Sequence, residues 1–219
     1  MKTKNFSILF IIFSVAFLIL AGTIAYSIFE KKKESKTDPF NYANQQTLGD
    51  KEAPVHIVEF GDFKCPACKT WDLSVLPQLK KEYIDTGKAQ LHFINFAFIG
   101  KDSVLAAQAG EAIYKQSEEA FWKFYDEIYQ NQQNEKTEWL TKDYITKVVQ
   151  DKLPEVNMEQ FQKDLESKEM KDEVQKDIDI ALKLKVQVTP SVYVNGKQAN
   201  PDYESIKNAI EGSKKKNGE

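Results

Sequence analysis

The chain contains two cysteines, Cys65 and Cys68, which are separated by Pro66 and Ala67. They come shortly after the apolar run 55–60, whose length and composition are typical of a buried β-strand. A single Cys-x-x-Cys pair cannot belong to a larger framework of disulfide bonds. Its spacing leaves three interpretations: a redox-active dithiol, half of a metal site, or a coincidence.

The two cysteines are expected to differ in reactivity. Pro66 suits the first position of a helix, which puts Cys65 at the N-cap. There the unpaired backbone N–H groups and the positive end of the helix dipole favour an anion such as a thiolate. The pKa of a free cysteine is about 8.5, and this setting lowers it to about 3.5–7.5. We therefore expect Cys65 to be the reactive thiolate, and Cys68, one turn into the helix, to be buried and to resolve mixed disulfides.

An acidic residue, Glu59, lies six positions before Cys65 inside the apolar strand run. A carboxyl group at this position is expected to be buried, and burial raises its pKa. A buried acid below Cys68 could exchange a proton with that thiol. The alternative is that Glu59 points to solvent.

Two metal sites are conceivable. Cys65 and Cys68 could join His56 and His92 as four zinc ligands, but both histidines lie in predicted strands and we expect them to have structural roles. A second group could hold a hard cation, although a solvated helix face is the favoured interpretation; it comprises Asp172, Glu173, Asp177 and Asp179. We expect no metal.

The pattern along the chain predicts an α/β sheet with a helical insertion. A helix begins at Pro66, is kinked by Pro77 and ends near Gly87, with an expected apolar stripe of Leu73, Leu76, Leu79 and Tyr83. Helical periodicity fills 103–185, where Ser117, Thr141 and Asn157 are expected N-caps and the aromatic stripe 121–129 is expected to form a core. The remaining elements are strands at 55–60, 90–98, 186–194 and 197–199, with an Asn195-Gly196 turn, and a helix at 202–211.

The N-terminal region has the composition of a membrane segment. No charged residue occurs in 6–29, a run long enough to cross a bilayer. We expect an uncleaved anchor within 1–30, with a cleaved signal peptide as the alternative, a flexible stalk over 31–47 and a charged tail over 212–219. All 30 basic residues are lysine and the net charge is −3, which argues against nucleic acid as a partner.

Two motifs together resemble the DsbA-like thiol-disulfide oxidoreductases. The stretch 58–68, Val-Glu-Phe-Gly-Asp-Phe-Lys-Cys-Pro-Ala-Cys, resembles their active-site strand and helix. The stretch 189–196, Thr-Pro-Ser-Val-Tyr-Val-Asn-Gly, resembles their cis-proline loop. The resemblance spans 48 to about 211, and with its N-terminal segment the chain is most similar to the membrane-anchored BdbD group of Bacillus. It departs at Ala67, where strongly oxidising members have histidine, so the expected oxidising strength is lower.

The resemblance implies a thioredoxin fold with an inserted all-helical subdomain, preceded by a transmembrane segment. The thioredoxin-like domain would comprise 48–102 and 186–211, and the insertion 103–185. Cys65 would be the nucleophile, Cys68 the resolving thiol and Glu59 the buried acid, with Pro66 and Ala67 completing the active-site motif. Thr189 and Pro190, joined by a cis bond, would bind substrate.

The implied function is the formation of disulfide bonds in exported proteins, by a monomer whose catalytic domain lies outside the cytoplasm. The redox-active disulfide Cys65–Cys68 would serve without a tightly bound cofactor. A quinone-linked membrane oxidase of the DsbB type would reoxidise it. An extracytoplasmic reductase or isomerase on the same fold is the alternative, and a peptide-binding protein with an unreactive dithiol is a further one.

Overall fold

The computed structural model describes residues 22–23 and 38–214, and the chain divides into two units, Met1–Asn41 and Tyr42–Glu219. Of the first unit, the structure describes a short helical piece at 22–23 and a turn in which the Asp38 carboxylate accepts the Phe40 N–H (3.0 Å). Within the described residues, no helix combines the length and apolarity needed to cross a bilayer. Apart from 22–23, the anchor predicted for 6–29 lies outside the described residues.

A five-stranded mixed sheet organises the second unit, in the order β1-β3-β2-β4-β5. Its central strand, β2, pairs in parallel with β3 and antiparallel with β4. The two edge strands, β1 and β5, are antiparallel to their neighbours. The strands are β1 (Gln46–Leu48), β2 (His56–Gly61), β3 (Gln90–Asn95), β4 (Ser191–Val194) and β5 (Lys197–Ala199).

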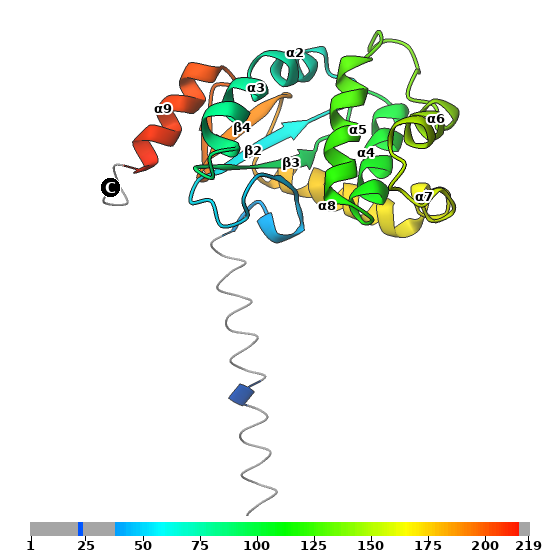
Figure 1. Cartoon of the computed structure of the whole chain (residues 1–219), viewed down its shortest axis with the longest axis horizontal. Coiled ribbons are helices and arrows are strands. Elements are labelled where there is room, and N and C mark those ends of the chain that lie inside the picture. The colour runs from blue at the N-terminus through cyan, green and yellow to red at the C-terminus, as the bar shows by residue number, and fades with distance from the viewer. Residues whose placement is uncertain (1–21, 24–37, 215–219) are drawn as a thin grey trace, which may run out of the picture. The chain divides into compact units, whose positions relative to one another are not determined.

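Helices cover both faces of this sheet (Figure 1). The predicted helical insertion between β3 and β4 is present and comprises α4–α8, of which α8 packs on β3. A 3-10 turn, Tyr42–Asn44, precedes β1, and a π-helical turn, Lys80–Ile84, follows α3. The helices are α2 (Pro66–Ser74), α3 (Leu76–Leu79), α4 (Lys101–Tyr114), α5 (Glu118–Gln130), α6 (Lys142–Lys152), α7 (Met158–Leu165), α8 (Lys168–Lys183) and α9 (Tyr203–Lys214).

The starts of the inserted helices follow the capping rules. Ser117, Thr141 and Asn157 are N-caps, as predicted, and each side chain accepts a backbone N–H from the first turn of its helix. Ser167 caps α8 in the same way. Each such cap stabilises its helix by about 1 kcal/mol, so short polar residues fix where the insertion changes direction.

An aromatic core joins the insertion to the sheet. The stripe predicted on 121–129 is buried on α5, and Tyr125 packs edge-on against Phe93 of β3 at 5.2 Å between ring centroids. Phe63, just after β2, contacts Phe93, Phe124 and Tyr129. Because one continuous core spans both parts, the insertion is held rigidly against the strand that leads to the cysteines.

Several predicted boundaries were wrong. The stalk predicted over 31–47 ends too late, because 42–48 forms the 3-10 turn and β1 of the folded unit. The predicted strand 90–98 ends at Asn95, where pairing with β2 stops. The predicted strand 186–194 begins only at Ser191, because Pro190 closes a loop. Leu73, placed on the buried stripe of the first helix, is 49% exposed, because the helix breaks at Val75, two residues before Pro77.

Candidate active site

The structure places the two cysteines at the positions that the sequence predicts. Cys65 is the N-cap of α2, with extended backbone angles, and Pro66 occupies the first helical turn. Both thiols are free, and their exposed fractions are 7% for Cys65 and 0% for Cys68. Pro66 and Ala67 are exposed. Cys65 is therefore the thiol that another protein can reach, and Cys68 lies behind it.

The local environment separates the pKa values of the two thiols. The pKa of Cys65 is lowered to about 6, first by a hydrogen bond from the Cys68 thiol and also by backbone N–H groups of Ala67 and Cys68 at the helix start. Burial raises the pKa of Cys68 well above its usual range. At neutral pH the pair holds one thiolate, on Cys65, and one proton, on Cys68.

Glu59 is fully buried in the middle of β2, between Phe93 of β3 and Val192 of β4. Its Oε2 accepts a 2.7 Å hydrogen bond from the Tyr125 hydroxyl, and its Oε1 has no partner among the described residues. Burial raises the pKa of this carboxyl well above its usual range. The neighbouring Gly61 leaves room for the Phe93 ring beside it, because a Cβ there would lie 2.4 Å from that ring and 3.2 Å from Oε1 of Glu59.

The loop before β4 lies against the reactive thiol. The Cys65 Sγ is 3.3 Å from the carbonyl oxygen of Thr189, to which Cys65 donates a hydrogen bond in its protonated thiol form. The bond between Thr189 and Pro190 is cis, as the resemblance implied, and Pro190 is buried. A loop that follows the cysteines by more than 120 residues thus forms one wall of the site.

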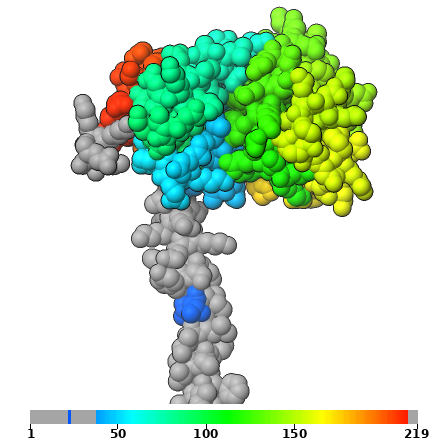
Figure 2. Space-filling view, in the orientation of Figure 1, coloured from blue at the N-terminus to red at the C-terminus, as the bar shows by residue number. Residues whose placement is uncertain are grey.

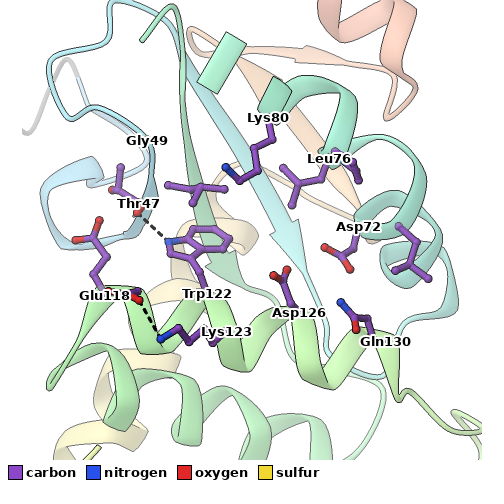
Figure 3. Close-up of a pocket in the computed structure, with 14 residues that line it drawn as sticks. Thr47, Gly49, Asp72, Leu76, Lys80, Glu118, Trp122, Lys123, Asp126 and Gln130 are labelled. Atoms are coloured by element: carbon purple, nitrogen blue, oxygen red, sulfur yellow. Dashed lines mark hydrogen bonds and ion pairs between the residues drawn. The ribbon is translucent and has the colours of Figure 1, made fainter. Parts of the chain in front are cut away.

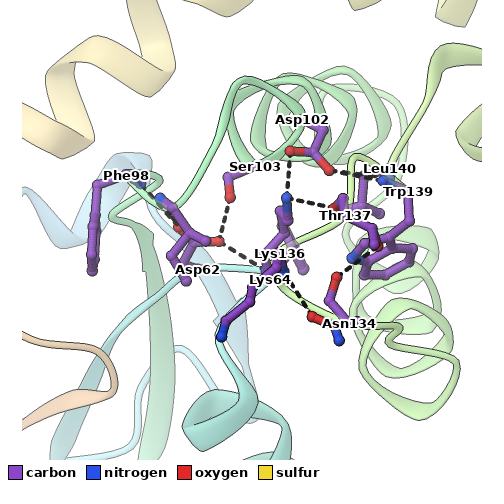
Figure 4. A network of polar contacts seen from close by, with 12 residues as sticks. Asp62, Lys64, Phe98, Asp102, Ser103, Asn134, Lys136, Thr137, Trp139 and Leu140 are labelled. Atoms are coloured by element: carbon purple, nitrogen blue, oxygen red, sulfur yellow. Dashed lines mark hydrogen bonds and ion pairs between the residues drawn. The ribbon is translucent and has the colours of Figure 1, made fainter.

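A buried ion pair, which the sequence pattern did not predict, adjoins Cys65 (Figure 4). The Lys64 Nζ donates to Oδ1 of Asp102 (2.7 Å) and to the Thr137 carbonyl (2.9 Å), and both charged side chains are about 95% buried. The second Asp102 oxygen accepts the N–H groups of Trp139 and Leu140. Lys64 therefore fixes the loop between α5 and α6 beside the dithiol.

Asp62 orders the approach to the cysteines in a similar way (Figure 4). Its Oδ1 accepts from the Lys64 N–H (2.8 Å) and the Ser103 hydroxyl (2.7 Å), and its Oδ2 accepts from the N–H groups of Phe98 and Ile99. The sequence feature that could have indicated buried polar contacts here is the pair of charged residues at positions 62 and 64, directly after an apolar strand.

Gln132, just after the end of α5, secures the active-site turn from the insertion side. Its Nε2 donates to the carbonyl oxygens of Phe63 (2.9 Å) and Cys65 (3.0 Å). These bonds occupy carbonyl groups on both sides of Lys64. The turn that presents the Cys65 sulfur is therefore held by Gln132, by Asp62 and by the ion pair of Lys64.

The zinc site conceivable from the sequence is contradicted by the geometry. His56 begins β2 and Cys65 follows its other end, so the strand separates them by about 16 Å or more. The histidines instead bond to each other, Nδ1 of His56 to Nε2 of His92 at 2.9 Å. No group of three or more His, Cys, Asp or Glu suited to a metal ion occurs among the described residues.

The acidic residues of α8 do not act as one group. Asp172, Glu173 and Asp179 are paired with Lys168, Lys176 and Gln175 along the solvated side of the helix. Asp177 is buried instead, and its Oδ2 accepts both the N–H and the side-chain amide of Asn95 at 3.0 Å. The solvated-face interpretation is therefore correct for three of the four residues.

A thioredoxin-type sheet with a reactive Cys-x-x-Cys pair at a helix N-terminus defines a thiol-disulfide oxidoreductase. A family model described as thioredoxin matches residues 42–212. The chain belongs to the disulfide bond formation protein D family of DsbA-like oxidoreductases, and it is an enzyme that introduces disulfide bonds into proteins.

Three known proteins illustrate the likeness. The probable disulfide bond formation protein D of Bacillus cereus is 60% identical over 99% of this chain and 100% of that protein. Disulfide bond formation protein D of Bacillus subtilis is 36% identical over 76% of each chain. The crystal structure of oxidised BdbD from Bacillus subtilis has a TM-score of 0.75 and 34% identity, covering 80% of this chain and 95% of that one.

Proposed function

We propose that Cys65 is the nucleophilic position of this oxidase, Cys68 the resolving thiol and Glu59 the acid that serves Cys68. The observation that carries this assignment is the opposite shift of the two thiols: the pKa of Cys65 falls to about 6, whereas that of Cys68 rises. A thiolate that is stable on Cys65 makes this sulfur the better leaving group when a client completes its own disulfide.

The reaction begins with the Cys65–Cys68 disulfide. A client thiolate attacks the Cys65 sulfur, forming a mixed disulfide and releasing Cys68, which takes a proton from Glu59. A second client thiolate then attacks the client sulfur of the mixed disulfide, and Cys65 leaves as a thiolate. Two electrons pass to the enzyme. The client releases two protons and one proton from solvent restores Glu59, so the net release is one proton.

Thr189 and Pro190 are proposed to bind the client backbone, because the Thr189 carbonyl already lies 3.3 Å from Cys65. Pro66 and Ala67 would form the exposed floor of the same site. The redox centre is the cysteine pair itself, and the mechanism uses no bound organic cofactor.

The proposed clients are reduced or unfolded exported proteins, and the proposed location is the outer side of the cell membrane. The uncharged run 6–29 supports a single membrane anchor, which would keep a monomeric catalytic domain near emerging chains. Reoxidation requires an acceptor for two electrons, for which we propose a quinone-linked membrane oxidase of the DsbB type.

The test is the reduction potential of the cysteine pair in glutathione buffers, together with oxidation of a reduced, unfolded test protein. The expected potential lies closer to that of DsbA, about −120 mV, than to that of thioredoxin, about −270 mV. Cys65→Ser should abolish oxidation. Cys68→Ser, which cannot form the internal disulfide, should accumulate a mixed disulfide when its Cys65 thiolate attacks a test protein that already contains a disulfide. A potential at the thioredoxin value would favour the reductase alternative, which the alanine at position 67, in place of a histidine, makes worth testing.

A further inference from the structure

A pocket of about 570 Å³ opens beside the active-site helix, between α2–α3 and α5. In the space-filling view, α2–α3 and α5 border each other on the face shown (Figure 2). The pocket has an apolar wall formed by Leu73, Leu76 and Trp122. Two aspartates, Asp72 of α2 and Asp126 of α5, extend into it from opposite sides (Figure 3).

Asp72 is an unusual residue for its position. It lies one helical turn after Cys68, is 5% exposed, and receives no hydrogen bond or ion pair from any described residue. Its carboxyl lines the pocket and so reaches solvent only through it, and this partial loss of solvation favours the protonated form. Asp126, at the exposed surface, likewise has no hydrogen-bond or ion-pair partner in the described part of the chain.

The other charged groups that line the pocket are already paired. Lys80 contacts Asp85, Lys123 contacts Glu119 and Glu155, and Glu118 contacts Lys51. Among the described lining residues, the carboxyls of Asp72 and Asp126 are therefore the ones without an ion-pair partner. Burial raises the pKa of Asp126, and the charge of Lys80 opposes part of this rise.

Three carboxyls form a series from the interior to the surface: Glu59 is fully buried, Asp72 almost so, and Asp126 exposed. Neighbours in this series affect each other electrostatically. Burial and then the charge of Asp126 raise the pKa of Asp72 to about 7. The pKa of Glu59 is raised mainly by burial, and the hydrogen bond from Tyr125 opposes this rise. The charge of Asp72 raises the pKa of Glu59 further. Asp72, with a pKa of about 7, is therefore partly protonated at neutral pH and can both accept and give a proton.

We propose that Asp72 and Asp126 carry protons between Glu59 and solvent through this pocket. The inference rests on the proposed role of Glu59 as the acid that serves Cys68. When the enzyme is reduced, Glu59 gives its proton to the Cys68 thiolate and becomes a carboxylate. Asp72 then returns one proton to Glu59, and Asp126 transfers one from solvent to Asp72. On reoxidation the same path runs outward, carrying the Cys68 proton to solvent.

The test uses Asp72→Asn and Asp126→Asn, which keep the shape of each side chain but cannot relay a proton. The matched control is Glu119→Gln, an exposed, ion-paired carboxyl of α5 that lines the same pocket. Oxidation of the reduced Cys65–Cys68 pair by oxidised glutathione is followed by tryptophan fluorescence in stopped flow, as a function of pH and in D₂O.

Asp72→Asn should slow closure of the Cys65–Cys68 disulfide about tenfold or more near neutral pH, because the Cys68 proton then loses its path outward; this is a modest fraction of what general acid–base catalysis supplies. It should also remove an inflection near pH 7 from the rate profile and increase the solvent isotope effect. Asp126→Asn should have a smaller effect in the same direction. Asp72→Glu, or added imidazole with Asp72→Asn, should restore the rate, which a merely structural role would not predict.

An Asp72→Asn enzyme with an unchanged rate, pH profile and isotope effect would overturn the proposal, as would equal slowing by Glu119→Gln. Glu59→Gln distinguishes failure of the proton path from failure of the proposed role of Glu59. Slowing by Glu59→Gln alone refutes the path through Asp72 and leaves the role of Glu59 intact. No slowing by either variant refutes both.

Discussion

The hydroxyl of Tyr125, on inserted helix α5, donates a 2.7 Å hydrogen bond to Oε2 of Glu59, on central strand β2. This contact joins the helical insertion to the acid behind the cysteines. It lowers the pKa of a carboxyl that burial otherwise raises, so the insertion helps to set how readily Glu59 releases its proton. The acid, its tyrosine partner, the two thiols and the buried ion pair can each be tested separately.

Glu59→Gln should stabilise the folded protein at neutral pH. The folded pKa of Glu59 lies above its unfolded value, so the wild-type carboxyl binds its proton more tightly when folded, and ionising it costs stability. Below the unfolded pKa of about 4.3, the difference in stability between the two proteins should not change with pH. Above it, the stability of the variant relative to the wild type should increase by about 1.4 kcal/mol for each pH unit, up to the folded pKa of Glu59. Urea unfolding across pH measures this, and a constant difference at all pH values would contradict it.

Tyr125→Phe should act in the opposite direction. It removes the hydrogen bond that lowers the pKa of Glu59, so the folded pKa should rise further and the pH-dependent loss of stability should extend to higher pH. The double variant Tyr125→Phe with Glu59→Gln should not show this loss of stability with rising pH, because it lacks the carboxyl group. Carboxyl chemical shifts from ¹³C-labelled glutamate measure the titration directly; an unshifted Glu59 signal would mean that the hydrogen bond does not form in solution.

The Cys65 thiolate should depend on its partner thiol. In the reduced protein we expect a thiolate absorbance that titrates with a pKa of about 6. Cys68→Ala removes the hydrogen bond that lowers this pKa most, so the titration should move upward. Ala67→Ser, at an exposed position between the cysteines, is the control for a small change in the same turn. An unmoved titration in Cys68→Ala would assign the shift to the helix N-terminus alone.

The reduced enzyme should become more stable relative to the oxidised one as pH rises from about 6 to about 9. Cys65 has a folded pKa of about 6, below its ordinary value of 9.0, so its thiolate adds stability that is lost as pH falls through the folded value. The oxidised form has no thiolate and lacks this dependence. Denaturation of both forms at about pH 5 and about pH 8 tests it, and parallel changes would exclude the thiolate as the cause.

Lys64→Met should be strongly destabilising, because it leaves the Asp102 carboxylate buried without its cation. Loss of one partner of a buried pair costs about 3–5 kcal/mol. Adding Asp102→Asn should recover much of this loss, because the amide oxygen can still accept the Trp139 N–H while the charge is gone. The double-mutant cycle gives the coupling energy. Additive effects would mean that the ion pair does not hold the loop between α5 and α6.

Local pattern accounts for what the sequence predicted correctly. The apolar run before Cys65, the capped helices of the insertion and the N-cap position of Cys65 each depend on neighbouring residues only. β1 was missed because Gln46 to Leu48 is a short, largely polar strand without an alternating pattern. The run 186–190 was assigned to a strand on its valines, although Val188 is 62% exposed and Pro190 ends a loop.

The contacts that complete the site were beyond such reasoning because they join distant segments. Nothing near Glu59 in the chain indicates that Tyr125 will donate to it, and nothing near Lys64 indicates Asp102. Asp72 shows the difficulty most clearly. The expected apolar stripe included Leu73 and not its neighbour Asp72, but it is Asp72, one turn after the buried Cys68, that faces inward, whereas Leu73 is exposed.

Thr189 reaches Cys65 across 124 positions of the chain, and β4, which carries the loop, pairs with the strand that leads to the dithiol. Contacts of such long sequence separation form late in folding. A chain that has emerged only as far as α8 already holds both cysteines, but it lacks the wall that the Thr189 loop supplies. A nascent chain that ends before this loop would therefore expose the dithiol without the surface against which a client is proposed to align.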